Sequence, residues 1–144
     1  MSVANSSSSS SVTDLVAPAQ YWHDPFNQTA FLAGSHFLAD INNEKEDKNP
    51  EYKEVLSSLE NFVMVKWISE TTIIPSQSSH FGFYNLGQDN TTLSLQELPL
   101  YKEDWLGLKE LDMQGKLHFK EMEGDHMHFD WSWFTENIVI PFLV

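Results

Sequence analysis

The stretch that decides the fold is Phe62-Val63-Met64-Val65-Lys66-Trp67-Ile68, a nearly continuous apolar run. A run of this length is typical of a central strand that is covered on both faces. Such strands belong to parallel sheets whose crossover connections are helical. The run therefore predicts an α/β protein.

A helix is predicted just before this strand. Asn49 can cap it, Pro50 suits its first position, and Glu51 and Glu54 favour the positive end of the helix dipole. Its apolar residues recur with the i, i+3, i+4, i+7 spacing of one helical face: Tyr52, Val55, Leu56 and Leu59.

The segments after the run continue the α/β pattern. The sequence predicts a short strand at His80–Tyr84, a helix at Leu100–Leu111 that Gly107 weakens, a second central strand at Lys116–Phe119, and a helix from the Asp130 cap to Ile140, where Pro141 stops it. Only two strands look central, whereas doubly wound sheets have about five or more. We therefore expect the C-terminal portion of an α/β fold with an incomplete central parallel sheet.

Composition limits the class of protein. The 144 residues include 41% hydrophobic residues, enough for one packed domain, and a formal charge of −13 disfavours binding to nucleic acid. The absence of cysteine excludes disulfides and thiolate metal sites, and no apolar run is long enough to span a membrane. Residues 1–14 are rich in serine and are expected to be a disordered tail, and residues 15–144 are expected to be the folded domain.

The sequence carries mixed signals about its compartment. Met1–Val12 has no apolar core, so no signal peptide is expected in this chain. Asn5, Asn27 and Asn90 each begin an N-glycosylation acceptor, which favours a secretory history. No cofactor is expected.

Two candidate catalytic side chains follow the two predicted central strands. Ser69 and Glu70 come after the first strand, and Glu123-Gly124-Asp125-His126 follows the second. Reacting groups of open α/β sheets lie outside the carboxyl ends of the strands. An acid followed by a histidine is the order found in α/β-hydrolases, in which the histidine activates a nucleophile and the acid orients the histidine.

Several stretches resemble the palmitoyl-protein thioesterase family, in particular its lysosomal type-1 enzyme. They run in register over residues 15–144. The stretches are Tyr21-Trp22-His23-Asp24-Pro25, Phe37-Leu38-Ala39-Asp40-Ile41-Asn42, Phe62-Val63-Met64-Val65-Lys66, Phe81-Gly82-Phe83-Tyr84, Leu106-Gly107-Leu108-Lys109-Glu110, Glu123-Gly124-Asp125-His126 and Ile140-Pro141-Phe142-Leu143.

The resemblance implies an α/β-hydrolase that removes fatty acyl groups from cysteine thioesters in the lysosome, acting on palmitoylated proteins or fatty acyl thioesters. It implies that His126 is the catalytic histidine and that Glu70 occupies the position of the family's catalytic aspartate. It also implies that Tyr21, Trp22, Phe37 and Leu38 contribute to an acyl groove. The chain departs from the family because it has no Gly-x-Ser-x-Gly elbow. Hydrolysis by this chain alone is therefore not expected, and whether it acts as an enzyme stays open.

Two other interpretations stay open. His126 and His128 could bind a metal with Glu123 or Asp125, and His118 could add a third nitrogen, although no known zinc spacing is matched. Alternatively, the chain is a truncated product that binds a lipid or a protein partner without catalysis, and its open sheet edge would favour association. The sequence does not identify the acyl-protein substrates or the oligomeric state.

Overall fold

The computed structural model describes residues 21–144. The expected tail at residues 1–14, the domain boundary at Leu15 and the sequon at Asn5 therefore lie outside the described residues. The elements, in chain order, are α2 (Gln28–Gly34), α3 (Leu38–Ile41), α4 (Pro50–Ser57), β1 (Phe62–Trp67), the 3₁₀ helix η2 (Ser76–His80), β2 (Phe83–Tyr84), β3 (Thr92–Leu93), the 3₁₀ helix η3 (Leu95–Glu97), α5 (Pro99–Lys102), α6 (Leu108–Met113), β4 (Leu117–Met122), α7 (Trp131–Phe134), the π-helical segment η4 (Thr135–Val139) and α8 (Ile140–Leu143).

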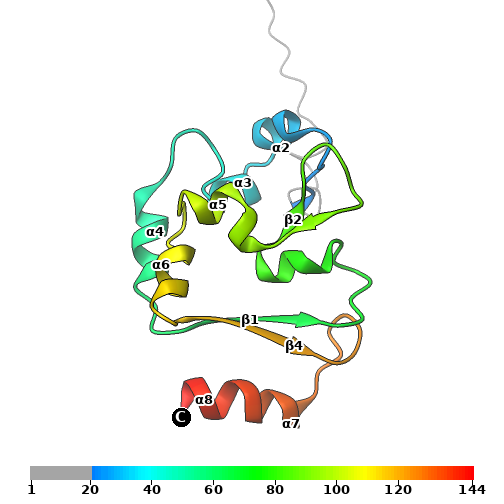
Figure 1. Cartoon of the computed structure of the whole chain (residues 1–144), viewed down its shortest axis with the longest axis vertical. Coiled ribbons are helices and arrows are strands. Elements are labelled where there is room, and N and C mark those ends of the chain that lie inside the picture. Colours follow the sequence, from blue (N-terminus) through cyan, green and yellow to red (C-terminus); the bar gives the residue numbers. More distant parts are fainter. Residues whose placement is uncertain (1–20) are drawn as a thin grey trace, which may run out of the picture.

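A parallel pair of strands, β1 and β4, forms the centre of the fold. Their register runs from Phe62 opposite Leu117 to Trp67 opposite Met122. The C-terminal helical segment from α7 to α8 lies on one side of this pair, and η2 with the remaining helices lies on the other (Figure 1). The layers are those of an α/β protein whose central parallel sheet is incomplete, as the sequence predicted.

The burial of β1 is lower than its apolar sequence predicted. Met64 is its only buried residue, and the other five are half-buried. The prediction of full cover on both faces was therefore wrong. The physical reason is that β1 has a single neighbouring strand, β4. A strand at the edge of a two-stranded sheet leaves much of its surface open to solvent.

The helix before β1 begins as predicted. The Asn49 side chain accepts a hydrogen bond from the Glu51 backbone N–H, and Pro50 occupies the first turn. Its apolar face is only partly used: Tyr52 and Leu56 pack against the core. Val55 and Leu59 remain 68% and 37% exposed.

The core lies on the η2 side of the strand pair. Its buried residues come mainly from the segment between Leu95 and Leu117, and three leucines are fully buried. The cluster comprises Met64, Leu95, Leu100, Leu106, Leu108, Leu111 and Leu117. This packing fixes the position of β4, and hence of the loop that follows it.

The predicted helix at Leu100–Leu111 is two helices, α5 and α6. Residues 103–107 separate them, and two of these, Asp104 and Gly107, have left-handed backbones, φ 56° and 78°. A Cβ added at Gly107 would come within 2.8 Å of the Ser57 Cβ in α4. Glycine thus permits both the left-handed turn into α6 and the close approach to α4.

Pro141 does not stop the last helix, contrary to the prediction. It lies within the first turn of α8, directly after the π-helical η4. Proline has no N–H to donate to the preceding turn, and its ring crowds that turn. The wider π turn before it accommodates both effects, so the helical path continues to Leu143.

The two short predicted strands have different bounds from those expected. Ser76–His80 is a 3₁₀ helix, so only β2 remains of the strand predicted at His80–Tyr84. It pairs with β3 in an antiparallel hairpin. The second central strand is longer than predicted, because β4 continues beyond Phe119 to Met122.

Candidate active site

The carboxyl ends of β1 and β4 place the two candidate catalytic residues side by side. The strands are parallel and in register, so both end at the same edge of the sheet. Their hydrogen bonds continue past the strands: the Ile68 N–H donates to the Met122 carbonyl at 2.9 Å, and the Ser69 N–H to the Gly124 carbonyl at 3.0 Å. Glu70 and His126 therefore emerge from two loops that are already joined.

A hydrogen bond links the two side chains. The distance between His126 Nδ1 and Glu70 Oε2 is 2.8 Å. The Glu70 side chain is 1% exposed, whereas that of His126 is 33% exposed. The acid is thus enclosed, and the imidazole reaches the surface.

The second carboxylate oxygen of Glu70 turns back onto its own loop. Oε1 accepts the backbone N–H groups of Thr72 at 2.7 Å and Ile73 at 3.0 Å. These bonds hold the longer glutamate side chain in a folded-back position from which Oε2 reaches the imidazole. Glutamate therefore reaches the imidazole from this position, where the family resemblance implies an aspartate.

The surroundings of Glu70 favour its ionised form. Burial acts to raise the pKa of its carboxyl group, but hydrogen bonds from His126 and from the Ile73 and Thr72 backbones outweigh it, so that the pKa is lowered. The pKa of Asp125 is also lowered, chiefly by hydrogen bonds from the His126 N–H and from Thr71. Both side chains thus favour the ionised carboxylate, whose oxygens accept hydrogen bonds and donate none.

The ionised acid determines what the imidazole can do. A carboxylate accepts but does not donate, so Nδ1 of a neutral His126 carries the proton. Nε2 is then left with a lone pair, on a side chain that is only partly enclosed. This is the arrangement in which a histidine acts as a general base towards a hydroxyl.

The loop that carries His126 has an unusual backbone. Gly124 has φ 111° and Met127 has φ 58°. A Cβ on Gly124 would come within 2.8 Å of His128 Cδ2. The Trp67 indole N–H donates to the His128 carbonyl at 2.9 Å, and its ring centroid lies 6.1 Å from that of His126. Glycine and Trp67 thus hold the loop close against the end of β1.

Three of the four residues expected at the acyl groove are exposed. Tyr21 and Phe37 are in contact, with ring centroids 5.2 Å apart, and are 62% and 42% exposed. Trp22 is 67% exposed, and Leu38 is half-buried at the start of α3. Their role in an acyl groove stays a prediction.

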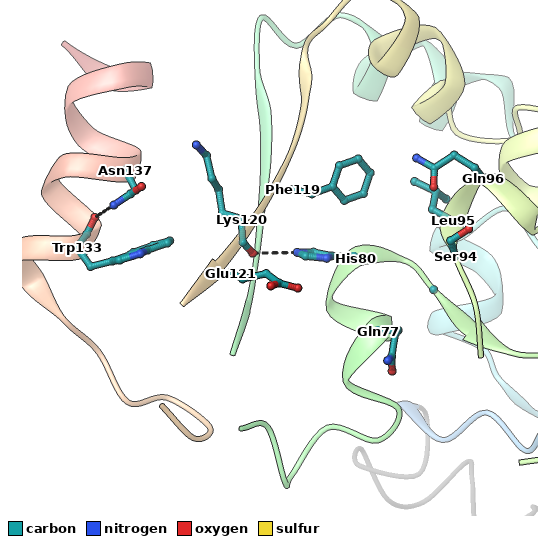
Figure 2. A pocket seen from close by; sticks show the side chains of 11 residues that line it. Gln77, His80, Ser94, Leu95, Gln96, Phe119, Lys120, Glu121, Trp133 and Asn137 are labelled. Carbon is teal, nitrogen blue, oxygen red and sulfur yellow. Dashed lines mark hydrogen bonds between the residues drawn. The ribbon is translucent and has the colours of Figure 1, made fainter. Parts of the chain in front are cut away.

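A surface depression lies away from the Glu70–His126 pair. It has a volume of about 570 Å³ and straddles β4, between η2 on one side and α7–η4 on the other (Figure 2). His80 lies within it, and its Nε2 is 3.0 Å from the Lys120 carbonyl oxygen. Neither Glu70 nor His126 lines this depression.

The described residues do not gather the histidines and acids proposed as a metal site. His118 lies near the start of β4, and its Nε2 is 2.9 Å from Asn61 Oδ1. His126 lies beyond the opposite end of that strand. Within residues 21–144, no group of three or more His, Asp or Glu side chains is arranged to hold a metal ion.

Two of the three glycosylation acceptors fall within the described residues. Asn27 is exposed and caps α2, accepting the Ala30 N–H at 3.1 Å. Asn90 is exposed between β2 and β3. In the described part of the chain no helix has the length and apolar character needed to cross a membrane.

An acid and a histidine, joined by a hydrogen bond after two paired parallel strands, are the arrangement expected for part of an α/β-hydrolase site. Comparison with known proteins narrows the class. The sequence model of the palmitoyl protein thioesterase family matches residues 2–126. The chain belongs to the palmitoyl protein thioesterase family, as its resemblance predicted.

Curated relatives agree with this assignment. The chain is 45% identical over 124 residues to palmitoyl-protein thioesterase 1 of Caenorhabditis elegans, and this match covers 86% of the chain and 41% of the relative. It is 41% identical over 130 residues to palmitoyl-protein thioesterase 3 of Dictyostelium discoideum, and this match covers 87% of the chain and 45% of the relative. It is 36% identical over 98 residues to lysosomal thioesterase PPT2 of Mus musculus, and this match covers 67% of the chain and 32% of the relative. The chain therefore spans less than half the length of these relatives.

Sequence reasoning missed the residues that support the pair. Thr71 directly follows the acid, and its Oγ1 donates to Asp125 Oδ1 at 2.8 Å. Trp67 ends β1 and reaches the His126 loop. The only sequence signal for the Thr71–Asp125 contact is a polar residue next to the acid and another next to the histidine. The parallel pairing of β1 with β4 is what brings the two together.

Proposed function

We propose that this chain contributes the histidine and the acid of a palmitoyl-protein thioesterase, with His126 as the general base and Glu70 as the acid that orients it. The observation that carries the proposal is the 2.8 Å bond between His126 Nδ1 and the enclosed Glu70 carboxylate. Family membership supplies the reaction, hydrolysis of long-chain fatty acyl thioesters on cysteine. The chain corresponds to the C-terminal portion of such a hydrolase.

The nucleophile would come from a segment other than these 144 residues. The sequence contains no Gly-x-Ser-x-Gly elbow, the motif that presents the attacking serine in α/β-hydrolases. A histidine without a hydroxyl to deprotonate cannot begin acyl transfer. The chain alone should therefore not hydrolyse a thioester, and it should not react with a fluorophosphonate probe.

Reconstitution tests this proposal. The 144-residue chain is mixed with the separately produced part of the Caenorhabditis elegans relative that it does not match, and release of palmitate from a palmitoyl-cysteine peptide is measured. We expect the mixture to gain thioesterase activity that His126→Ala abolishes and His118→Ala retains. Activity of the unmixed chain that His126→Ala removes would overturn the assignment of the nucleophile to another segment.

The relatives also support a cellular location. One of them is named a lysosomal thioesterase, and we infer that this chain is a lysosomal glycoprotein modified at Asn27 and Asn90, with Asn5 as a third acceptor. A glycan on Nδ2 of Asn27 would leave Oδ1 free to keep its bond to the Ala30 N–H. Secretory expression followed by glycosidase digestion should show a mass loss that Asn27→Gln and Asn90→Gln each reduce.

Binding of a lipid or a protein partner without catalysis is the second candidate function. Large apolar side chains are exposed on the last helical segment, including Trp131 at 72% and Leu143 at 70%. Exposed apolar area of this kind attracts hydrophobic ligands and other chains. Purified protein should bind a hydrophobic dye strongly and associate. A monomer that does not bind the dye would exclude this candidate.

A further inference from the structure

A second link between the two catalytic loops lies beside the Glu70–His126 bond. Asp125 Oδ1 accepts the Thr71 hydroxyl at 2.8 Å and the backbone N–H of His126 at 2.7 Å. Thr71 directly follows the acid, and Asp125 directly precedes the histidine. The same oxygen therefore contacts both loops, one residue away from each member of the pair.

The second link constrains the imidazole because it fixes the backbone from which the ring projects. Two residues with positive φ, Gly124 and Met127, flank Asp125 and His126, so the chain turns sharply on both sides of them. Between these turns, the bonds of Asp125 and the contact with Glu70 tie the segment to the loop after β1. A fixed N–H at His126 limits where its Cβ and ring can lie relative to Glu70.

We propose that Asp125 and Thr71 are positioning residues: together they hold the His126 backbone so that Nδ1 stays against the Glu70 carboxylate. Neither residue touches the reacting atoms in this arrangement. Asp125 acts through the His126 N–H, and Thr71 acts by fixing the Asp125 carboxylate. The bond between ionised Asp125 and its donors is charge-assisted, which strengthens it although both side chains lie at the surface.

The alternative is that the Thr71–Asp125 contact only braces the fold. The two roles predict different results for the imidazole. A brace would change the free energy of unfolding and leave the proton on Nδ1. A positioning contact would also change how often Nδ1, rather than Nε2, carries the proton of the neutral ring, because Glu70 favours Nδ1–H only while the two groups are in place.

Nitrogen-15 NMR of the histidine side chains in the full 144-residue chain measures this directly. At a pH where the imidazole is neutral, we expect Thr71→Val and Asp125→Ala to reduce the ratio of Nδ1–H to Nε2–H tautomers of His126 by roughly two- to fivefold. The ratio should move towards that of Glu70→Ala. Thr71→Ser keeps the hydroxyl and should retain the wild-type ratio.

Thr135→Val is the matched control. Thr135 is also exposed, and its hydroxyl donates to the Trp131 carbonyl at 2.8 Å, away from the pair. It should leave the tautomer ratio unchanged. An unchanged ratio in Thr71→Val and Asp125→Ala with folded spectra, or an equal change in Thr135→Val, would overturn the proposal. If Asp125→Ala does not fold, Thr71→Val against Thr71→Ser decides.

This inference rests on the proposed role of His126, but the two can fail separately. The tautomer ratio is read without substrate or nucleophile. Failure of reconstituted hydrolysis with an intact tautomer response would leave the positioning contact in place and remove the thioesterase assignment. Full hydrolytic activity with no change in the tautomer ratio would keep the thioesterase assignment and remove the positioning contact.

Discussion

The two ends of the β1–β4 strand pair each carry a histidine that meets an oxygen across the strands, and they differ in almost everything else. At the carboxyl end, His126 meets the Glu70 carboxylate at 2.8 Å. At the amino end, His118 meets the Asn61 amide oxygen at 2.9 Å. The bond lengths are nearly equal. The acid at one end is enclosed and charged, whereas the amide at the other is exposed and neutral.

The difference lies in what surrounds each oxygen. The Glu70 carboxylate meets the His126 ring and two backbone N–H groups, and its loop is tied to Asp125 as well. Asn61 Oδ1 meets the His118 ring, which rests on Phe142 with centroids 4.5 Å apart. A histidine–oxygen bond therefore does not define a catalytic site by itself. A fixed, ionised acid with its own network is what orients an imidazole.

The largest difference in unfolding free energy between the two ends is expected from replacing the glycine beside each end. Gly124 lies after β4 with φ 111°, and an added Cβ would meet His128; Gly115 lies before β4 with φ 71° and open space around it. Gly124→Ala should cost roughly 2–4 kcal/mol of unfolding free energy, from backbone strain and the clash. Gly115→Ala should cost roughly 1 kcal/mol, from strain alone. Urea unfolding of both variants measures the contrast, and equal losses would show that the carboxyl-end loop is not tightly built.

Acid should weaken the carboxyl-end pair, because its partner oxygen belongs to an ionised carboxylate. The lowered pKa of Glu70 means that its contribution to stability is complete above the ordinary glutamate value of about 4.3 and is lost as the pH falls through the lower folded value. Glu70→Gln should therefore be less stable than wild type at neutral pH, by less than Gly124→Ala, since the side-chain shape is kept. The difference between the urea midpoints of the two proteins should shrink as the pH falls from 7 towards 3. A constant difference across that range would contradict the ionised role.

Much of this arrangement could be predicted from the sequence, because it follows from local chemistry. The order strand–acid and strand–histidine placed Glu70 and His126 at one sheet edge, and the cap at Asn49 fixed the helix before β1. Gly107 was predicted to weaken the helix at Leu100–Leu111, but its close approach to Ser57 in α4 depends on the tertiary packing and could not be predicted. Nor could the helix beyond Pro141, which depends on a π turn. The Thr71–Asp125 bond joins residues 54 positions apart and needs the strand register.

A substitution at Trp67 shows whether its bond to the His126 loop and the Glu70 carboxylate stabilise the carboxyl end independently. Its indole N–H donates to the His128 carbonyl at 2.9 Å. Trp67→Phe removes that donor and keeps an aromatic ring, so it should lower the unfolding free energy by about 1 kcal/mol. The acid dependence attributed to Glu70 should remain. Loss of that dependence in Trp67→Phe would mean that the indole, rather than the carboxylate network, holds the pair.

The smallest effect is expected at the amino end. Asn61→Ala removes an exposed, neutral partner of His118, and water can replace the lost bond, so the unfolding free energy should fall by no more than roughly 0.5 kcal/mol. The substitution should also leave the His126 tautomers untouched, since the full length of β4 separates the two histidines. If Asn61→Ala instead destabilises as much as Glu70→Gln, charge and enclosure cannot be what distinguishes the two ends, and the orienting role of Glu70 loses its physical basis.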